Sequence, residues 1–254
     1  MYKANSKSLV LVGALSLATL FSFSSHATIV EVETSQGNFK INLHDETTPQ
    51  TVENFLNYIN DGDYNNTVVH RLVPDFIVQA GGYSFEGDFP LTAISTDPTV
   101  LNEPIYSNVR GTIAMAKVGG NPNSATSQWF INYKDNSANL DAQNGGFTVF
   151  GEVIEGMDNL DNIALLPICS EIPMPEYTST ECADADFVPG VDNFVTIHTV
   201  TIIDDSATTD ASLASVKNTS LNNEESSDSG GGSFSYFTLF LLSFFGCRRI
   251  IRKK

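Results

Sequence analysis

The sequence predicts a mainly β protein whose strands close into an antiparallel barrel. Between residues 28 and about 205 it contains many short segments rich in β-branched and aromatic residues, separated by turn residues. Only two segments have the apolar spacing of a helix, and they are isolated from each other. Many short strands with two isolated helices favour a closed antiparallel barrel over a parallel α/β sheet.

The first expected element is a β-hairpin. Apolar and polar side chains alternate over residues 30–34 and again over 39–43, and Gln36 and Gly37 between them suit a turn. A period of two gives each strand one apolar face, which can cover a core.

The second expected element is an amphipathic helix. Thr47 or Thr48 can cap its start, Pro49 suits its first turn, and Gly62 can end it. Apolar residues recur at the i, i+3, i+4, i+7 spacing of one helix face, namely Val52, Phe55, Leu56 and Ile59.

The rest of the body is expected to be mostly β, with a second helix over residues 157–164 after Gly156. The expected strands are 68–72, 76–80, 112–117, 129–133, 148–154 and 194–203. Two stretches rich in proline and acids look like insertions, at about 85–106 and 166–192. Residues 206–229 have few large apolar side chains and are expected to form a disordered polar spacer.

Both ends of the chain suggest export. Residues 1–27 combine lysines, an apolar run and a small-x-Ala site, as in a secretory signal peptide; the alternative is an uncleaved membrane anchor. Residues 230–254 combine a glycine run, an apolar segment shorter than the ~20 residues of a transmembrane helix, and a basic end. This tail resembles the Gly-Gly sorting signals of some Gram-negative bacteria, which a rhomboid-type membrane protease cleaves; the alternative is a simple C-terminal anchor.

These features predict a protein of the periplasm or outer cell surface of a Gram-negative bacterium, with the tail-processing protease as one partner. Between residues 28 and 229 only six basic residues accompany all 30 acids, a formal charge of −24. Such a body repels nucleic acid and anionic membranes, so neither is expected as a partner. The charge keeps an exported protein soluble, and we expect a monomer.

The cysteines predict a disulfide and no metal site. Cys169 and Cys182 lie 13 residues apart in a loop-like stretch of an exported chain, where disulfides persist, so we expect them to be bonded. Cys247 lies in the tail and would leave with it. No Cys-x-x-Cys or Cys/His cluster suggests a metal.

The candidate functional site lies in two runs of sequence. Residues 69–79 read Val-His-Arg-Leu-Val-Pro-Asp-Phe-Ile-Val-Gln, and residues 127–131 read Ser-Gln-Trp-Phe-Ile. One cation, two amides and several apolar side chains suit a site that holds an uncharged peptide. They do not suit one that cleaves it, because Ser127 lacks a Gly-x-Ser-x-Gly elbow and His70 has no partners for a triad. His70 is therefore expected to be structural.

These runs, together with Phe-Gly-Glu-Val at 150–153 and Gly-Met at 156–157, resemble the cyclophilin peptidyl-prolyl isomerases. The resemblance spans residues 28 to about 203. It implies an eight-stranded antiparallel barrel closed by two helices, with the site on its outer face. It also implies isomerisation of X-Pro bonds in proline-containing polypeptides, without a cofactor.

The resemblance assigns roles to individual positions. Its catalytic positions fall on Arg71, Phe76, Gln79 and Gln128. Its positions for the proline ring and the substrate backbone fall on Ile77, Ala116, Lys117, Phe130, Leu140 and Phe147.

Four positions depart from the family's usual residues. Ile77 replaces Met, Lys117 stands where Asn is common, and Phe147 stands where many members have His or Tyr. Asn139 stands where many have Trp or Phe, which argues against high cyclosporin affinity. Phe147 keeps the pocket apolar, so catalysis is expected to survive this change.

The residue chemistry supports the same activity. Rotation about a peptide bond has a barrier of about 18–20 kcal/mol, and no covalent bond changes, so neither a nucleophile nor a metal is needed. An Arg fork can donate to the nitrogen and the carbonyl of the twisting bond and stays charged at any working pH. Gln79 could orient Arg71, and Gln128 could bind the substrate backbone.

Two alternatives stay open at this point. Arg71 could be a surface salt-bridge partner in an acidic protein, and the phenylalanines could be ordinary barrel core. A rival function is a catalytically weak cyclophilin-like module, a holdase or surface adaptor that grips proline segments with little turnover.

Overall fold

The computed structural model describes residues 28–184, 186–206 and 213–221. The predicted signal peptide at 1–27 and the predicted tail at 230–254 lie outside the described residues.

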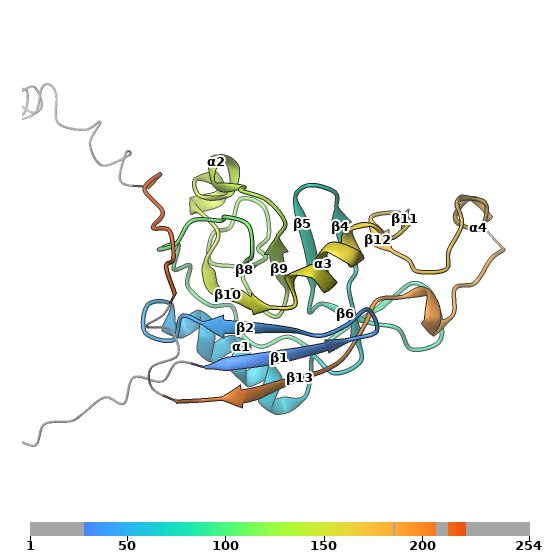
Figure 1. Cartoon of the computed structure of the whole chain (residues 1–254), viewed down its shortest axis with the longest axis horizontal. Helices are drawn as coiled ribbons and strands as arrows, with labels where there is room; N and C mark the ends of the chain where they lie inside the picture. The colour runs from blue at the N-terminus through green and yellow to red at the C-terminus, as the bar shows by residue number, and fades with distance from the viewer. Residues whose placement is uncertain (1–27, 185, 207–212, 222–254) are drawn as a thin grey trace, which may run out of the picture.

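One large antiparallel sheet forms the body of the protein (Figure 1). Its strand order is β4-β5-β9-β8-β10-β2-β1-β13-β3-β6-β7. The strands are β1 (Ile29–Thr34), β2 (Phe39–Leu43), β3 (Thr67–Val68), β4 (Arg71–Val73), β5 (Ile77–Ala80), β6 (Tyr83–Ser84), β7 (Thr92–Ala93), β8 (Thr112–Met115), β9 (Trp129–Asn132), β10 (Val149–Glu155) and β13 (Thr196–Asp204). β11 (Ile168–Cys169) and β12 (Ile172–Pro173) form a separate two-stranded sheet.

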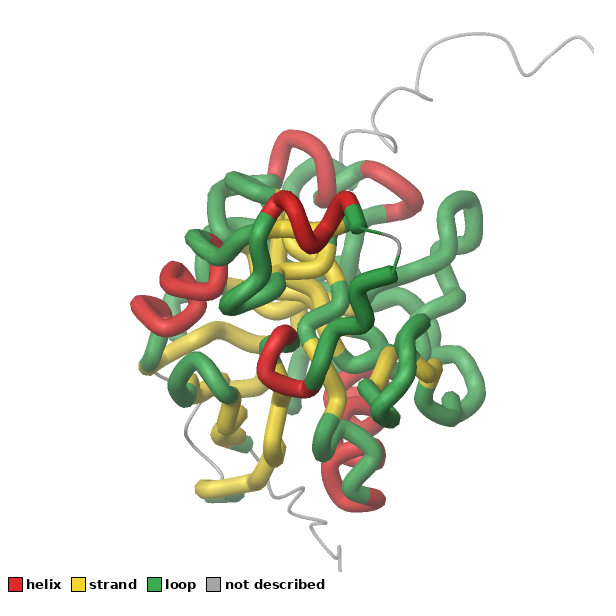
Figure 2. The backbone as a smooth tube through the Cα atoms, turned by 90° about the vertical axis from the view of Figure 1, so that its right-hand side faces the viewer, coloured by secondary structure: helices red, strands yellow, loops and turns green. Residues whose placement is uncertain are grey.

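The sheet curls on itself, as the strands at the centre of Figure 2 show. β3 and β4 are consecutive pieces of one stretch of chain, although they stand far apart in the strand order. Between them, the Val69 amide donates to Val195 next to β13, and the His70 amide donates to Gln79 on β5. The expected strand 68–72 is broken here because its hydrogen-bond partner changes. The prediction of a mainly β, antiparallel fold is confirmed.

The predicted N-terminal hairpin is present, and its alternation has the expected effect. β1 pairs with β2 and, on its other edge, with β13. Val30 faces Ile41 and Val32 faces Phe39 across the hairpin. All four side chains are buried in the main core, since one face of the pair covers that core.

Helices accompany the sheet: α1 (Pro49–Asp61), α2 (Ser137–Leu140), α3 (Met157–Ala164) and α4 (Ser179–Ala183). α3 has the predicted bounds, whereas the short α2 and α4 were not expected. Short 3-10 turns lie at Gln143–Gly145 and Val191–Asn193. Among the described residues, none of these helices has the length and apolar content needed to cross a bilayer.

α1 starts and ends where the sequence predicted. An unexpected residue accepts the hydrogen bond from a free backbone amide of its first turn. Gly62 ends the helix with φ of 77°, a left-handed conformation that glycine adopts without strain. Thr48 occupies the predicted N-cap position, but its side chain makes no capping bond, because the Thr48 hydroxyl donates to His44 O instead.

The first turn of α1 is held by Glu103, from the first predicted insertion. A Glu103 carboxylate oxygen accepts from Thr51 N at 2.9 Å and from Thr51 Oγ1 at 2.8 Å. A carboxylate there satisfies free amides of the first turn and lies at the positive end of the helix dipole.

The main core lies between α1 and the inner face of the sheet. Phe55 from α1 packs against Trp129 and Phe150, with ring centroids 6.4 and 5.1 Å away. Apolar side chains from both layers surround these rings, so the helix closes one side of the core.

The two predicted insertions pack on the body at a third apolar cluster. Ile172, Met174 and Tyr177 from the second insertion join Phe85 from the first, and Phe85 stacks at 4.7 Å on Phe194 of the body. The second insertion is therefore anchored by buried apolar side chains and the first by the partly buried Phe85, although their composition is acidic.

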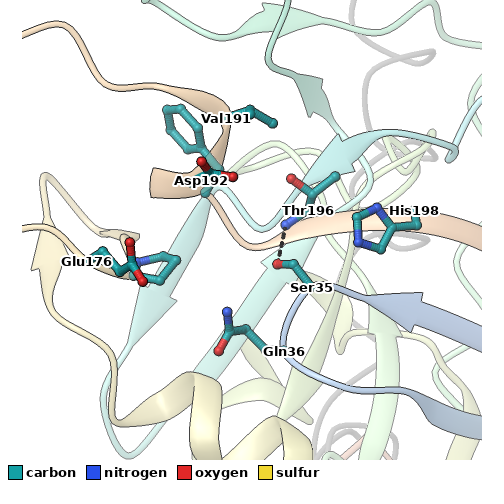
Figure 3. Close-up of a pocket in the computed structure, with 9 residues that line it drawn as sticks. Ser35, Gln36, Glu176, Val191, Asp192, Thr196 and His198 are labelled. Carbon is teal, nitrogen blue, oxygen red and sulfur yellow. Dashed lines mark hydrogen bonds between the residues drawn. The ribbon is translucent and has the colours of Figure 1, made fainter.

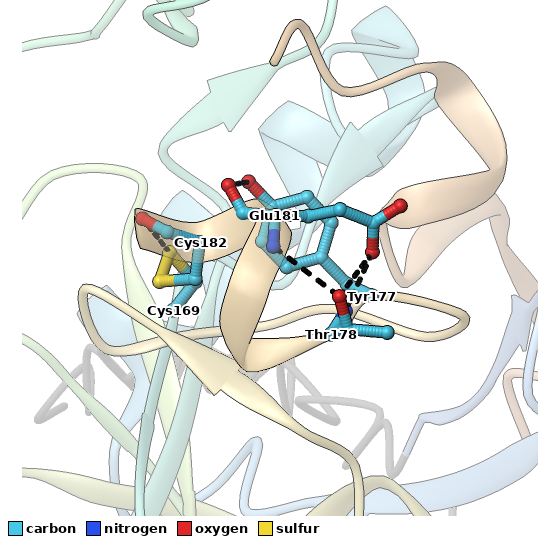
Figure 4. The surroundings of a disulfide bond; sticks show 5 residues. All are labelled: Cys169, Tyr177, Thr178, Glu181 and Cys182. Atoms are coloured by element: carbon cyan, nitrogen blue, oxygen red, sulfur yellow. Dashed lines mark hydrogen bonds between the residues drawn. A yellow bond between two sulfur atoms is a disulfide. The ribbon is translucent and has the colours of Figure 1, made fainter. Parts of the chain in front are cut away.

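The predicted disulfide is present in the second insertion. Cys169 on β11 is bonded to Cys182 on α4, with the Cα atoms 5.7 Å apart (Figure 4). Thr178 and Glu181 form a capping box that starts α4: Thr178 Oγ1 accepts from Glu181 N, and Glu181 Oε2 accepts from Thr178 N. The bond thus joins the small β11–β12 hairpin to a capped helical turn.

Part of the expected disordered spacer contacts the body. Ser107 N donates to Val216 O at 2.8 Å, Asn218 N donates to Ile105 O at 2.9 Å, and the Lys217 amine lies 4.1 Å from the centre of the Tyr106 ring. The expectation of disorder is wrong for residues 213–221, because a neighbouring backbone segment supplies partners that composition does not reveal.

We expect Glu103→Ala to lower the free energy of unfolding by about 1 kcal/mol, because the first turn of α1 loses its acceptor. Glu103→Gln keeps an oxygen and should lose less. Urea denaturation measures both. Glu53→Ala, which removes an exposed acid from the same helix, should stay within about 0.5 kcal/mol; an equal loss in this control would contradict the capping role.

Candidate active site

Three of the predicted site residues lie in one row of paired positions across neighbouring strands. Arg71 on β4 pairs with Gln79 on β5, Gln79 pairs with Phe130 on β9, and Phe130 pairs with Ala114 on β8. Directly paired residues of an antiparallel sheet project to the same face. The strand register therefore brings the cation, an amide and an aromatic ring together.

The next row of the same strands faces the opposite way. Val78, Ile131 and Ile113 pair with one another across β5, β9 and β8, and all three belong to the main core. Because side chains alternate along a strand, the row that carries Arg71 lies on the outer face of the sheet.

A second apolar cluster on this outer face brings together most of the predicted substrate-binding residues. Its buried members Ile77, Phe130 and Leu140 are at most 5% exposed. Phe76, Ala116 and Phe147 pack against them and stay partly exposed. The cluster thus has a solid apolar floor with accessible edges, which suits a proline ring.

The walls of this cluster are fixed by specific contacts. The Phe147 ring meets Phe130 edge-on, with centroids 5.7 Å apart. The Phe76 carbonyl accepts from Tyr133 N at 2.9 Å and from Asn136 Nδ2 at 3.0 Å. Asn139 lies on α2, one turn after Asn136, and is exposed. It contributes no aromatic ring to the cluster, unlike the Trp or Phe that is usual at this position.

The two predicted glutamines form a hydrogen-bonded pair beside the cluster. Gln79 Nε2 donates to Gln128 Oε1 at 2.8 Å, and His70 Nε2 contacts the same oxygen at 3.2 Å. With its oxygen engaged twice, the Gln128 amide presents its NH₂ group as a donor.

His70 holds this amide as a neutral ring. Burial lowers the pKa of His70 to about 4, so the imidazole is uncharged near pH 7. The ring also packs edge-on against Tyr83 at 4.8 Å. His70 belongs to the site through Gln128, a role that the sequence did not reveal because its partner lies 58 residues away.

Arg71 is held by a residue that the motifs do not contain. Its Nε donates to Glu171 Oε2 at 3.0 Å, and the Arg71 side chain keeps 36% of its surface exposed. The Gln79 amide donates to Gln128, and no hydrogen bond between Gln79 and Arg71 is found among the described residues, so an orienting role of Gln79 stays a prediction. Arg71 does have a salt-bridge partner, as the alternative interpretation allowed, but the contact leaves the guanidinium open to solvent.

Lys117 lies at the far edge of the cluster. Its amine donates to Asn144 O at 3.0 Å and to Gly146 O, and it sits 4.6 Å from the centre of the Phe147 ring. Burial lowers the pKa of Lys117 from 10.5 to about 8. Two carbonyls and a ring face therefore hold an amine that is close to losing its charge.

A separate cavity of about 400 Å³ lies away from this site (Figure 3). It is lined by the turn of the first hairpin, by β13 and by the second insertion, and it shares no residue with the candidate site. Ser35 Oγ accepts from Thr196 N at its base. Within the part of the chain that the structure describes, no group of three His, Cys, Asp or Glu residues could hold a metal ion.

Comparisons with known proteins agree with this geometry. The family model of the cyclophilin-type peptidyl-prolyl cis-trans isomerases/CLD matches residues 29–182. A peptidyl-prolyl cis-trans isomerase of Acinetobacter baylyi is 41% identical over 148 residues, which cover 57% of this chain and 77% of that protein. Peptidyl-prolyl cis-trans isomerase A of Dickeya dadantii is 40% identical over 164 residues, covering 61% of this chain and 83% of that protein.

A solved structure extends the comparison to the fold. The cyclophilin-type peptidyl-prolyl cis-trans isomerase of Cryptosporidium parvum superposes with a TM-score of 0.50 at 25% identity, over 69% of this chain and 97% of that chain. The apolar cluster beside Arg71 thus lies on a sheet whose fold resembles that of a solved cyclophilin-type structure. The chain belongs to the cyclophilin-type peptidyl-prolyl cis-trans isomerase family, and it is an enzyme of that class.

We expect the Lys117 side chain to titrate near pH 8 in the folded protein. Because 10.5 is its ordinary pKa, the unfolded chain binds more protons between about pH 8 and 10.5, so the free energy of unfolding should rise with pH in this window. NMR titration of the lysine ε-methylene signals measures the midpoint, and Lys117→Arg identifies the signal by removing it. A midpoint near 10.5 would contradict the burial of this amine.

Proposed function

We propose that this isomerase accelerates X-Pro isomerisation during the folding of exported or envelope proteins, with Arg71 stabilising the twisted amide. The supporting observation is the row that joins Arg71, Gln79 and Phe130 on the outer face, beside an apolar cluster. This row gives one cation access to a bond whose proline ring rests on the cluster.

The apolar cluster would hold the pyrrolidine ring of the substrate. Ile77, Phe130 and Leu140 form its floor, and the partly exposed Phe76 and Phe147 form its edges. A fixed ring lets the carbonyl side of the imide bond rotate against a stationary partner, and positioning of this kind lowers the entropic part of the barrier.

Arg71 would act on the twisted state of the bond. Twisting removes the C–N double-bond character, so the proline nitrogen becomes pyramidal and can accept a hydrogen bond. The guanidinium can donate to it and is already charged and held before the bond turns. Each ~1.4 kcal/mol of stabilisation that is present only in the twisted state is worth a factor of ten in rate.

The amides would hold the flanking backbone of the substrate. The Gln128 NH₂ group can donate to a peptide carbonyl, since Gln79 and His70 already occupy its oxygen. Contacts to backbone alone make little demand on the substrate's side chains, so we propose exposed X-Pro segments of many proteins as substrates.

The proposed cellular location of the protein rests on its N-terminal and C-terminal segments. Residues 1–27 support secretion and residues 230–254 support recognition by a tail-processing membrane protease. An acidic body and a disulfide fit an oxidising compartment such as the periplasm or the outer cell surface, where we propose that the protein acts as a monomer.

We expect Arg71→Ala to lower kcat/KM for proline isomerisation by about 100-fold, because the twisted amide loses its charged donor. Proline-limited refolding and a short X-Pro peptide assay measure this. Lys40→Ala is the control, since Lys40 is a cation that pairs with Glu155 and has no described contact with the candidate site.

Two outcomes would reject parts of this proposal. Undiminished catalysis by Arg71→Ala would reject the arginine mechanism. A wild-type protein that binds proline peptides without accelerating their isomerisation would instead support the holdase function.

We expect the protein isolated from the cell envelope to begin near Thr28 and to lack the basic residues at its end. Cleavage after residue 27 and near the glycine run would produce this form. Intact mass spectrometry of the envelope fraction measures both ends. A mass that includes Arg248–Lys254 would contradict removal of the tail, and one that includes residues 1–27 would contradict a cleaved signal.

A further inference from the structure

The second insertion places a tight hairpin next to the site. In this hairpin Ile168 on β11 pairs with Pro173 on β12, and Cys169 pairs with Ile172. A turn of only two residues, Ser170 and Glu171, joins the two strands. Their φ angles are 51° and 73°, so both are left-handed. A two-residue hairpin turn with both residues left-handed normally favours glycine or asparagine, and a glutamate here is unusual.

Glu171 is bonded to β4 through both its backbone and its side chain. Its carbonyl accepts from Leu72 N at 2.6 Å, and its carboxylate Oε2 accepts from Arg71 Nε at 3.0 Å. The backbone bond fixes the place of Glu171 beside the strand, and the side chain then reaches the neighbouring residue on that strand.

Two further contacts hold the hairpin in this position. Ile172, which follows Glu171, is buried in the third apolar cluster with Val68 and Phe194 of the body. Cys169, which precedes the turn, is bonded to Cys182 on α4 (Figure 4). In Figure 1 the hairpin stands beside β4. The carboxylate therefore approaches Arg71 from an anchored element.

The carboxylate engages only one of the three nitrogens of the guanidinium. Glu171 accepts at Nε, and no hydrogen bond of the two terminal nitrogens is found within the described ranges. Since a guanidinium is planar, a bond at Nε fixes its plane and leaves the terminal nitrogens to donate elsewhere.

We propose that Glu171 is a positioning residue for isomerisation: it holds the Arg71 guanidinium at Nε so that the terminal nitrogens face the twisting imide bond. This rests on the proposed role of Arg71. The disulfide-bonded insertion then has a part in catalysis, as the carrier of this carboxylate.

The test uses three variants of the full exported chain. Glu171→Gly removes the carboxylate and suits the left-handed backbone, so the hairpin should remain folded. Glu171→Gln keeps an oxygen that can accept from Nε. Glu176→Gly is the matched control, because Glu176 is an exposed acid of the same insertion with φ of 54° and has no described contact with Arg71.

NMR exchange measurements on a short X-Pro peptide give kcat and KM. We expect Glu171→Gly to lower kcat about fivefold with little change in KM, as suits the loss of one partly exposed ion pair. Glu171→Gln should recover to within about twofold of the wild type. Glu176→Gly should match the wild type, and thermal denaturation should show that Glu171→Gly loses no stability.

A double-mutant cycle decides whether Glu171 acts through Arg71. If it does, Glu171→Gly should have no further effect in an Arg71→Ala background. An equal loss in both backgrounds, or an unchanged kcat for Glu171→Gly in the wild-type background, would overturn the positioning role while leaving Arg71 catalytic. Failure of Arg71→Ala itself to reduce kcat would overturn the proposed function as well, so the two failures are distinguishable.

Discussion

The alternation of side chains along β5 is the constraint on which the site depends. Val78 and Ala80 point into the main core, and Ile77 and Gln79 point to the outer face. The same four residues thus contribute to the main core and present the candidate site, because a pleated strand has two independent faces. A shift of register by one residue would bury Gln79 and expose Val78.

The acidic insertions act on the site and on the fold through single carboxylates. Glu103 holds the first turn of α1 from 52 positions away, and Glu171 holds Arg71 from 100 positions away. Apolar contacts anchor each insertion, so the backbone that carries these acids is held against the body. The strongly negative composition therefore does not reveal that these two acids make specific contacts.

Burial sets the charge of the groups around the pocket. His70 is neutral near pH 7 because burial lowers its pKa to about 4, and this allows it to hold the Gln128 oxygen without adding a second cation. Burial also lowers the pKa of Lys117, to about 8. Two carbonyls and the Phe147 ring keep the Lys117 amine at the far edge of the cluster. Arg71 is thus the cation at the exposed end of the amide row.

The sequence by itself determined the antiparallel β class, the bounds of α3 and the end of α1, and it named residues that gather in the outer-face apolar cluster, because periodicity, turn residues and contiguous motifs are local signals. Only the tertiary structure decided that Glu103 rather than Thr48 satisfies α1, that residues 213–221 contact the body, and that Glu171 holds Arg71. These contacts join residues far apart in the chain, and a pattern read along the chain carries no information about which distant side chains meet.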